Sequence, residues 1–216
     1  MNFETAKINM IKQQIHTLGR SHEDITQAFM QTPREQFVPR LYENLAYSDM
    51  PIPISDHTHM LTPRLIAQAI NITEIHKTDR VLVIHTETGY TTAICCHLAS
   101  EVISIDTSEE NNEKAKYRLK ALGLYNPKFI TCDIYSNDIN EKPFDVIIIQ
   151  GSLKSIPNKL FDNLIDSGRL FAILDNGTTE EGVCFTKEKG HIKKSSILDT
   201  KIDALESQPK ETIFNF

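Results

Sequence analysis

Residues 80–84 have the sequence RVLVI and residues 101–106 have the sequence EVISID, and these two apolar runs decide the fold class. Each run is short and rich in β-branched residues, which predicts a buried strand. Between them, residues 89–99 (GYTTAICCHLA) predict a helix. A strand, a helix and a second strand in this order form a parallel βαβ unit, which is typical of α/β proteins.

The same alternation continues toward the C-terminus. Three further apolar runs are predicted strands of the same sheet: residues 128–132, 145–149 and 169–174. Helices are predicted from Ser108 to Gly123 and near residues 156–165. Late antiparallel strands are predicted at residues 183–189 and after His191, and the tail with Ile213, Phe214 and Phe216 suggests a last strand or a docked end. We therefore predict a doubly wound, mostly parallel sheet.

The N-terminal third has helical patterning instead. A first helical face is predicted from apolar residues spaced by three and four, before a stop at Gly19: Ile8, Ile11, Ile15 and Leu18. A second helix begins at Ser21 with Asp24 as its capping partner. A third has Thr62 as N-cap and Pro63 at its first position. We predict one domain over residues 1–216, in which a helical segment (1–78) precedes the α/β core (79–216).

Composition excludes several classes of protein. The 216 residues contain 23 Lys and Arg against 29 Asp and Glu, a net charge of −6, which argues against a nucleic-acid coat. No apolar run approaches the roughly 20 residues of a membrane span, and the N-terminus lacks the apolar region of a signal peptide. Four cysteines without disulfide-framework spacing indicate reduced thiols. We expect a cytoplasmic protein, and the sequence contains no signal for an oligomeric state.

A doubly wound sheet binds its ligands beyond the carboxyl ends of its strands. The segments where a ligand is expected are residues 85–90, 106–108, 133–136 and 150–154. Asp106 ends the second predicted strand, where an acid can accept hydrogen bonds from the ribose hydroxyls of a nucleoside; the alternative is a helix N-terminal acid. Asp145 is interpreted as a structural acid at a strand start. A nicotinamide dehydrogenase is disfavoured because the Gly-x-Gly-x-x-Gly turn is absent.

Several stretches together carry a resemblance to a known family. They are MIKQQI (10–15), TPREQFVP (32–39), LAYSDMPIPI (45–54), RVLVIHTETGYTTA (80–93), LKALGLYNPKF (119–129) and PFDVIII (143–149). In them the chain resembles the protein-L-isoaspartate O-methyltransferase family. The resemblance implies the Rossmann-like fold of S-adenosylmethionine (SAM) methyltransferases, with SAM as cofactor. It also implies protein repair, in which the isoaspartyl carboxylate of a damaged protein or peptide is methylated and the ester then collapses to a succinimide.

The cofactor loop departs from the family pattern of a strand ending in an acid followed by Gly-x-Gly-x-Gly. Val83, His85 and Glu87 stand at the acid and the first two glycines, and only Gly89 remains. The resemblance implies a cofactor site formed by His85, Thr86, Glu87, Gly89, Asp106 and Asp133, with Asp133 facing the adenine amino group; the alternative for Asp133 is a plain loop aspartate. Glu87 either repels the carboxylate of SAM or turns toward its amino group or sulfonium. Cofactor binding is therefore either eroded or adapted.

The substrate loop departs as well. The hydroxyl residue that the family associates with catalysis falls on Leu61, and the neighbouring Thr falls on His59. If the reaction persists, Thr58, His59 or Thr62 must replace that hydroxyl. We predict His59 as the catalytic residue, because an imidazole can hydrogen-bond a carboxylate and, when protonated, balance its charge.

Three further alternatives remain. The altered loops are also compatible with a non-catalytic relative, a pseudoenzyme that acts as a binding or scaffold protein. His57, His59 and His85 with Asp56 or Glu87 are metal-ligand types, but His-x-His is common by chance, so no metal is predicted. The basic residues 190–194 (GHIKK) are interpreted as a solvated strand end rather than a partner site.

Overall fold

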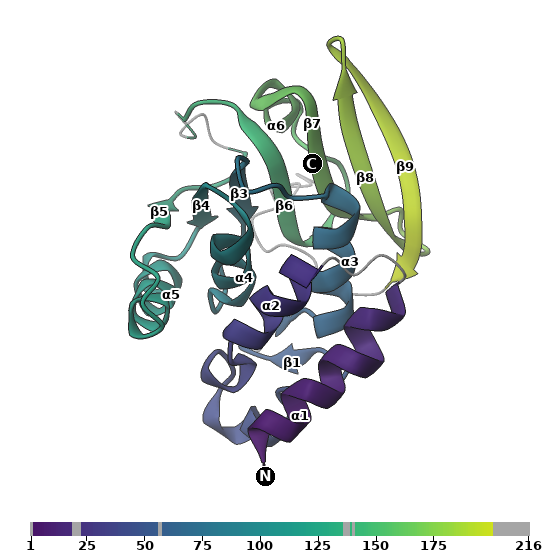
Figure 1. The fold of residues 1–216 in the computed structure, drawn as a ribbon. Coiled ribbons are helices and arrows are strands. Elements are labelled where there is room, and N and C mark those ends of the chain that lie inside the picture. The colour runs from purple at the N-terminus through teal and green to yellow at the C-terminus, as the bar shows by residue number, and fades with distance from the viewer. Residues whose placement is uncertain (1, 19–22, 56–57, 136–138, 140, 201–216) are drawn as a thin grey trace, which may run out of the picture.

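The computed structural model describes residues 2–18, 23–55, 58–135, 139 and 141–200. In that part of the chain a seven-stranded sheet has the order β5-β4-β3-β6-β7-β8-β9 (Figure 1). Its strands are β3 (Arg80–Ile84), β4 (Glu101–Asp106), β5 (Lys128–Thr131), β6 (Phe144–Leu153), β7 (Leu164–Asp175), β8 (Glu180–Glu188) and β9 (His191–Thr200). Neighbours from β5 to β7 are parallel, whereas β8 pairs antiparallel with β7 and β9. The predicted mostly parallel sheet is confirmed.

Helices precede and separate these strands. They are α1 (Phe3–Met10), α2 (Glu23–Gln31), α3 (Pro63–Thr73), α4 (Tyr90–Leu98), α5 (Glu109–Ala121) and α6 (Asn158–Asp162). A π-helical turn (Ile11–Ile15) and a 3-10 turn (His16–Leu18) continue α1, and two further 3-10 turns cover Arg34–Gln36 and Arg40–Leu45. A small antiparallel ladder joins β1 (Ile52–Pro53) to β2 (His59–Met60). None of the helices in the described ranges is long and apolar enough to span a membrane.

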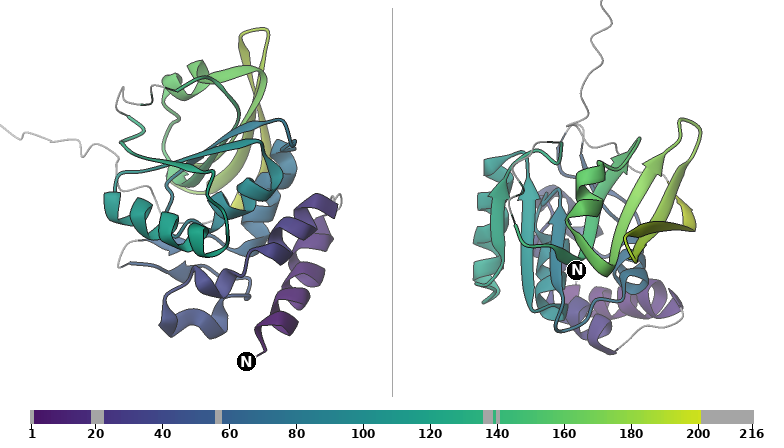
Figure 2. Two further views of the ribbon diagram at one scale, coloured as in Figure 1. Left: turned by 60° about the vertical axis from the view of Figure 1, so that its left-hand side comes forward. Right: turned by 90° about the horizontal axis from the view of Figure 1, so that it is seen from above.

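Alternate residues of β3 belong to two apolar clusters, one on each face of the sheet. Val81 and Val83 lie in a cluster with side chains of α1 to α5, and Leu82 and Ile84 lie in a second cluster that includes Leu160 of α6. Figure 2 shows the N-terminal helices gathered at one side of the sheet. Helices therefore cover both faces, which confirms the doubly wound arrangement.

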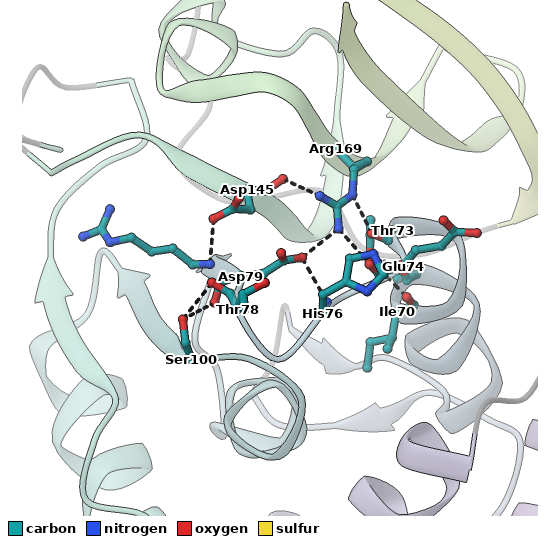
Figure 3. Close-up of polar contacts among 11 residues, drawn as sticks. Ile70, Thr73, Glu74, His76, Thr78, Asp79, Ser100, Asp145 and Arg169 are labelled. Atoms are coloured by element: carbon teal, nitrogen blue, oxygen red, sulfur yellow. Dashed lines mark hydrogen bonds and ion pairs between the residues drawn. The ribbon is translucent and has the colours of Figure 1, made fainter.

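Arg169 of β7 fastens the sheet to the end of α3 (Figure 3). Its guanidinium donates to the carbonyl oxygens of Thr73 at 2.8 Å and Glu74 at 2.7 Å, and it pairs with Asp79 Oδ2 at 2.7 Å. Asp145 Oδ2 accepts a bond of 2.8 Å from the amide of Arg80. Asp79 and Asp145 both lie at the amino-terminal ends of strands. Asp145 thus has the structural role that the sequence suggested.

Local sequence signals agree with several helix boundaries. Thr62 caps α3 by accepting a bond of 3.2 Å from the amide of Leu65, and Pro63 opens the helix. Ser108 caps α5 in the same way through the amide of Asn111. The predicted boundaries at Gly19 and Ser21 lie outside the described residues, as does the C-terminal tail with Ile213, Phe214 and Phe216. All four cysteines are free thiols.

The helix predicted near residues 156–165 is too long. The helix α6 covers only Asn158–Asp162, and Asn163 ends it. Leu164 instead begins β7 and pairs with Phe144 of β6, while its side chain is buried. Pairing with a strand some 20 residues away in sequence therefore replaces the last turn of the expected helix.

Candidate functional site

An open cavity of about 230 Å³ lies at the carboxyl-terminal ends of β3 and β4. Its polar lining among the described residues consists of Ser55, Thr58, His85, Asp106, Thr107, Ser108 and Asn111. Its apolar lining consists of Ile84, Ile105, Cys132 and Ile134. Parallel sheets expose such a crevice where the strand order reverses. Here the order reverses at β3, which has β4 on one side and β6 on the other. The cavity is the place at which the sequence predicted a ligand.

Asp106 is held by donors from the loop after β3 and from the start of α5. Its Oδ2 accepts the amide of Glu87 at 3.0 Å, and its Oδ1 accepts the amide of Ser108 at 2.9 Å and Nδ2 of Asn111 at 3.2 Å. An ionised carboxylate has about four acceptor positions, so these three bonds leave room for one more donor at the cavity wall. The remaining acceptor position fits a ribose hydroxyl, which would donate to it.

The loop after β3 has the backbone of a glycine-rich turn although two of its residues carry large side chains. His85 has a φ of 67°, Glu87 a φ of 51° and Gly89 a φ of 88°. Left-handed backbone is uncommon for residues other than glycine, and each such residue costs roughly 1 kcal/mol or more. The loop thus keeps the path that glycines would give it, and the added side chains must be accommodated beside that path.

The His85 imidazole turns toward β6. Its Nδ1 lies 3.0 Å from the carbonyl oxygen of Gln150, and Gln150 Nε2 donates to the carbonyl of His85 at 2.7 Å. Thr91 of α4 donates its hydroxyl proton to Gln150 Oε1. A carbonyl oxygen only accepts, so His85 Nδ1 carries its proton. The ring therefore borders the cavity instead of filling the loop.

Glu87 is buried behind that ring. Only 4% of its side chain is exposed, and its Oε1 lies 3.6 Å from His85 Nδ1. The Arg34 guanidinium is fully buried, 4.7 Å from the centre of the Tyr90 ring. Burial lowers the pKa of Arg34, whereas Tyr90 and Glu87 act to raise it. Glu87 thus places a negative charge in the cofactor loop close to a buried cation.

Thr86 and Gly89 hold the loop through contacts with β4 and α5. The Thr86 hydroxyl bonds to Ser104 Oγ at 2.8 Å and donates to Asn112 Oδ1 at 2.9 Å. Thr86 is not among the residues that line the cavity. Gly89 packs against α5, where an added Cβ would lie 2.8 Å from the Cβ of Ala115. Both residues support the loop that the resemblance assigns to the cofactor, through contacts with the protein.

Asp133 lies next to the cavity lining, between Cys132 and Ile134. Its side chain is half-buried, and Oδ1 accepts the amide of Tyr135 at 2.9 Å. Asp133 therefore follows the carboxyl-terminal end of β5 and is one residue from two lining side chains, without being in the lining itself.

The substrate loop approaches the same cavity from the N-terminal segment. Thr58 and Ser55 line the cavity, whereas His59 is half-buried on β2 opposite Pro53 of β1 and is not among the lining residues. Leu61 is 5% exposed, and its carbonyl accepts Nη2 of Arg34 at 2.6 Å. The position of the expected hydroxyl is thus an apolar core position.

Two further sequence hypotheses concerned a metal site and the basic residues 190–194. In the described ranges no group of three or more His, Cys, Asp or Glu residues is suited to a metal ion, and Asp56 and His57 lie outside those ranges. Lys194 of the basic cluster pairs with Glu181 across β8 and β9 at 2.8 Å, and residues 191–195 are exposed.

Three contributors to the site region were not predicted from the sequence. Gln150 lies in a segment where a ligand was expected but had no predicted role, and Asn111 lies in the first turn of α5. Arg34 entered the sequence prediction only as part of the TPREQFVP run. No local signal marks Arg34 as buried, because Glu35 and Gln36 beside it in the same run are polar as well.

Comparison with known proteins gives consistent results. The family model described as protein-L-isoaspartate(D-aspartate) O-methyltransferase matches residues 5–202. A protein-L-isoaspartate O-methyltransferase from Methanoculleus marisnigri is 30% identical over 184 residues, which cover 85% of this chain and 84% of the relative. One from Geobacter metallireducens is 31% identical over 189 residues, which cover 88% of each chain.

Solved structures share the fold. A Plasmodium falciparum protein described as a protein-L-isoaspartate O-methyltransferase, crystallised with S-adenosyl-L-homocysteine (SAH), superposes with a TM-score of 0.81. The two chains are 20% identical, and the alignment covers 96% of this chain and all of the other. A second solved protein-L-isoaspartate O-methyltransferase has a TM-score of 0.79 at 23% identity, covering 94% of this chain and 65% of that one.

Proposed function

Because this chain belongs to the protein-L-isoaspartate(D-aspartate) O-methyltransferase family, we propose that it transfers the methyl group of SAM to the isoaspartyl carboxylate of damaged proteins or peptides. The observation that carries the proposal is the family match over residues 5–202 together with the cavity beside Asp106. We further propose that residues 1–216 act as one domain. One apolar cluster, which contains side chains from both α1 and β3, supports that assignment.

The acceptor groups at and beside the cavity suit a nucleoside cofactor. Asp106 would accept a ribose hydroxyl, and Asp133 would accept the adenine amino group. The backbone and side chains of the loop from His85 to Gly89 would border the amino-acid part. Three existing bonds to Asp106 fix its carboxylate before any ligand arrives, so little ordering remains to be done on binding.

The reaction requires the acceptor carboxylate to be positioned more than it requires proton transfer. When bound, SAM supplies an electrophilic methyl group. The acceptor is a carboxylate, which is already an anion at neutral pH, so no proton has to be removed from it. The protein therefore needs to orient the acceptor and exclude water rather than to supply a general base. For this reason the loss of a hydroxyl at Leu61 is compatible with activity.

His59 is our candidate for holding the acceptor carboxylate. Thr62 is a weaker candidate, because its hydroxyl already caps α3 through the amide of Leu65. Thr58 lines the cavity and could assist as a second donor. A half-buried imidazole on the adjoining strand β2 can donate a hydrogen bond and, when protonated, offset the acceptor charge. We place the reaction in the cytoplasm, with damaged proteins or peptides as partners and without nucleic acid or membrane.

Methyl transfer to matched peptides tests the proposal. Folded protein is incubated with methyl-labelled SAM and either an isoaspartyl peptide or the same peptide with an ordinary aspartyl residue. We expect a base-labile methyl ester on the isoaspartyl peptide alone. No transfer above buffer, with protein in excess, would contradict the proposal. SAM binding without transfer would favour the non-catalytic relative instead.

A further inference from the structure

The cofactor loop of this chain contains a buried carboxylate at a position where the family pattern has glycine. We infer that Glu87 makes the site select a cationic cofactor over its neutral product, so that SAM binds more tightly than SAH. This inference rests on the proposed function, because it concerns the same cavity. It assigns to Glu87 a role as a specificity-determining residue.

The geometry holds Glu87 close to the binding site. Its amide donates to Asp106 Oδ2 at 3.0 Å, so its backbone adjoins the carboxylate that lines the cavity. Its own carboxylate is 3.6 Å from Nδ1 of His85, whose ring also lines the cavity. With 4% of the side chain exposed, solvent screens this charge poorly.

The described lining of the cavity carries a negative charge. In the described part of the lining, Asp106 is a carboxylate and no Lys or Arg side chain is present. Arg34 offsets part of the Glu87 charge, but it is turned toward the core. Its Nε donates to the carbonyl of Ala46 at 2.8 Å and its Nη2 to that of Leu61 at 2.6 Å. The His85 Nδ1 proton faces the carbonyl of Gln150 at 3.0 Å, which is closer than the Glu87 carboxylate at 3.6 Å.

The two ligands form a natural test pair. SAM and SAH share their adenosine and amino-acid groups, so contacts of Asp106 with the ribose cancel in the ratio of their dissociation constants. They differ by one methyl group and one positive charge on sulfur. Sinefungin has an amine-bearing carbon in place of the methylsulfonium, so it retains the positive charge without the sulfonium. If charge decides the ratio, sinefungin will behave like SAM.

We would measure the three dissociation constants by calorimetry at pH 8 for the wild type and for Glu87→Gln, which keeps the shape and removes the charge. We expect SAM and sinefungin to bind the wild type at least about tenfold more tightly than SAH. In Glu87→Gln this preference should fall toward one, while the SAH affinity changes by less than about threefold. The matched control is Glu110→Gln on α5, an exposed carboxylate paired with Lys114 at 2.6 Å, which should leave the ratio unchanged.

Each outcome is decisive. Equal or tighter binding of SAH by the wild type overturns the inference without any variant. A test on the wild type alone is needed because Glu87→Gln removes a negative charge that offsets the charge of the buried Arg34. A folded Glu87→Gln protein that keeps the full preference also overturns it, since the selecting charge then lies elsewhere. Methyl transfer with SAH favoured refutes the inference and leaves the proposed function standing. Absence of binding by all three ligands contradicts both.

Discussion

The backbone amide of Glu87 donates a hydrogen bond of 3.0 Å to Oδ2 of Asp106. This bond joins the loop after β3 to the acid that ends β4, so the two parts of the cofactor site are fixed relative to each other. A glycine in place of Glu87 could make the same bond, because only the backbone is used. The altered loop therefore keeps the framework of the site while it changes the charge of the site.

Gly89 provides the most direct test of the loop geometry. An added Cβ would lie 2.8 Å from the Cβ of Ala115 and 2.9 Å from Cδ1 of Leu119, at a φ of +88°. We expect Gly89→Ala to lower the free energy of unfolding by about 2 to 4 kcal/mol, because steric overlap adds to backbone strain. Urea denaturation measures the change.

Gly123→Ala is the matched control for this variant. Gly123 also has a left-handed φ, of +77°, but among the described residues no heavy atom beyond its chain neighbours lies within 4 Å of the position that an added Cβ would take. Strain alone should cost about 1 kcal/mol there. Equal losses for the two variants would show that α5 does not press against the loop.

The sequence predicted much of the fold because the relevant signals are local. The strands β3 and β4 were placed at their observed bounds, since both are short apolar runs buried on two faces. The start of α3 followed from Thr62 and Pro63, whose capping chemistry needs no distant partner. The end of α6 could not be found in this way, because the pairing of Leu164 with Phe144 is a tertiary contact.

The candidate site was predictable in location but not in detail. Asp106 and His85 were found because sheet topology places strand ends at the ligand edge. The role of Gln150 could not be derived, since its partner His85 is 65 residues away in sequence. The buried environment of Arg34 likewise depends on carbonyl groups 12 and 27 residues further along the chain.

Arg169 is expected to stabilise the fold without touching the cavity. Arg169→Leu would leave the carboxylate of Asp79 buried without its cation and free the carbonyls at the end of α3. We expect a loss of about 3 kcal/mol in unfolding free energy. The control is Arg64→Leu, which breaks a more exposed pair with Asp49 at 2.6 Å and should cost less than about 1 kcal/mol. Similar losses for both variants would refute the assignment.

His59 should affect turnover rather than cofactor affinity. We expect His59→Ala to lower kcat by about tenfold or more, because the acceptor carboxylate loses its positioning group, with the Kd for SAM unchanged. His59→Gln, which retains a hydrogen-bond donor, should recover part of the rate. His191→Ala on β9 serves as the control for removing an exposed imidazole. Unchanged kcat in His59→Ala would exclude His59 from the reaction.

Glu141 predicts a pH dependence of stability. The hydrogen bond from Lys128, together with Arg80, holds the pKa of Glu141 below its ordinary value of 4.5. A lowered folded pKa adds stability above about pH 4.5, and that stability is lost as the pH falls through the folded value. Glu141→Gln should therefore be less stable than wild type at pH 7, with the difference shrinking below pH 4.5. A difference that stays constant down to acid pH would contradict this account.

The central claim is that the altered loop and Asp106 still form a SAM site, and calorimetric titration of the wild type and Asp106→Asn with SAM tests it most directly. We predict a Kd near the micromolar range for the wild type, about −8 kcal/mol, and binding weakened at least about tenfold in the variant, because a ribose hydroxyl loses a charged acceptor. Thermal melting of both proteins checks that the variant is folded. No heat of binding by folded wild type at millimolar SAM, or equal affinity in the two proteins, would contradict the account.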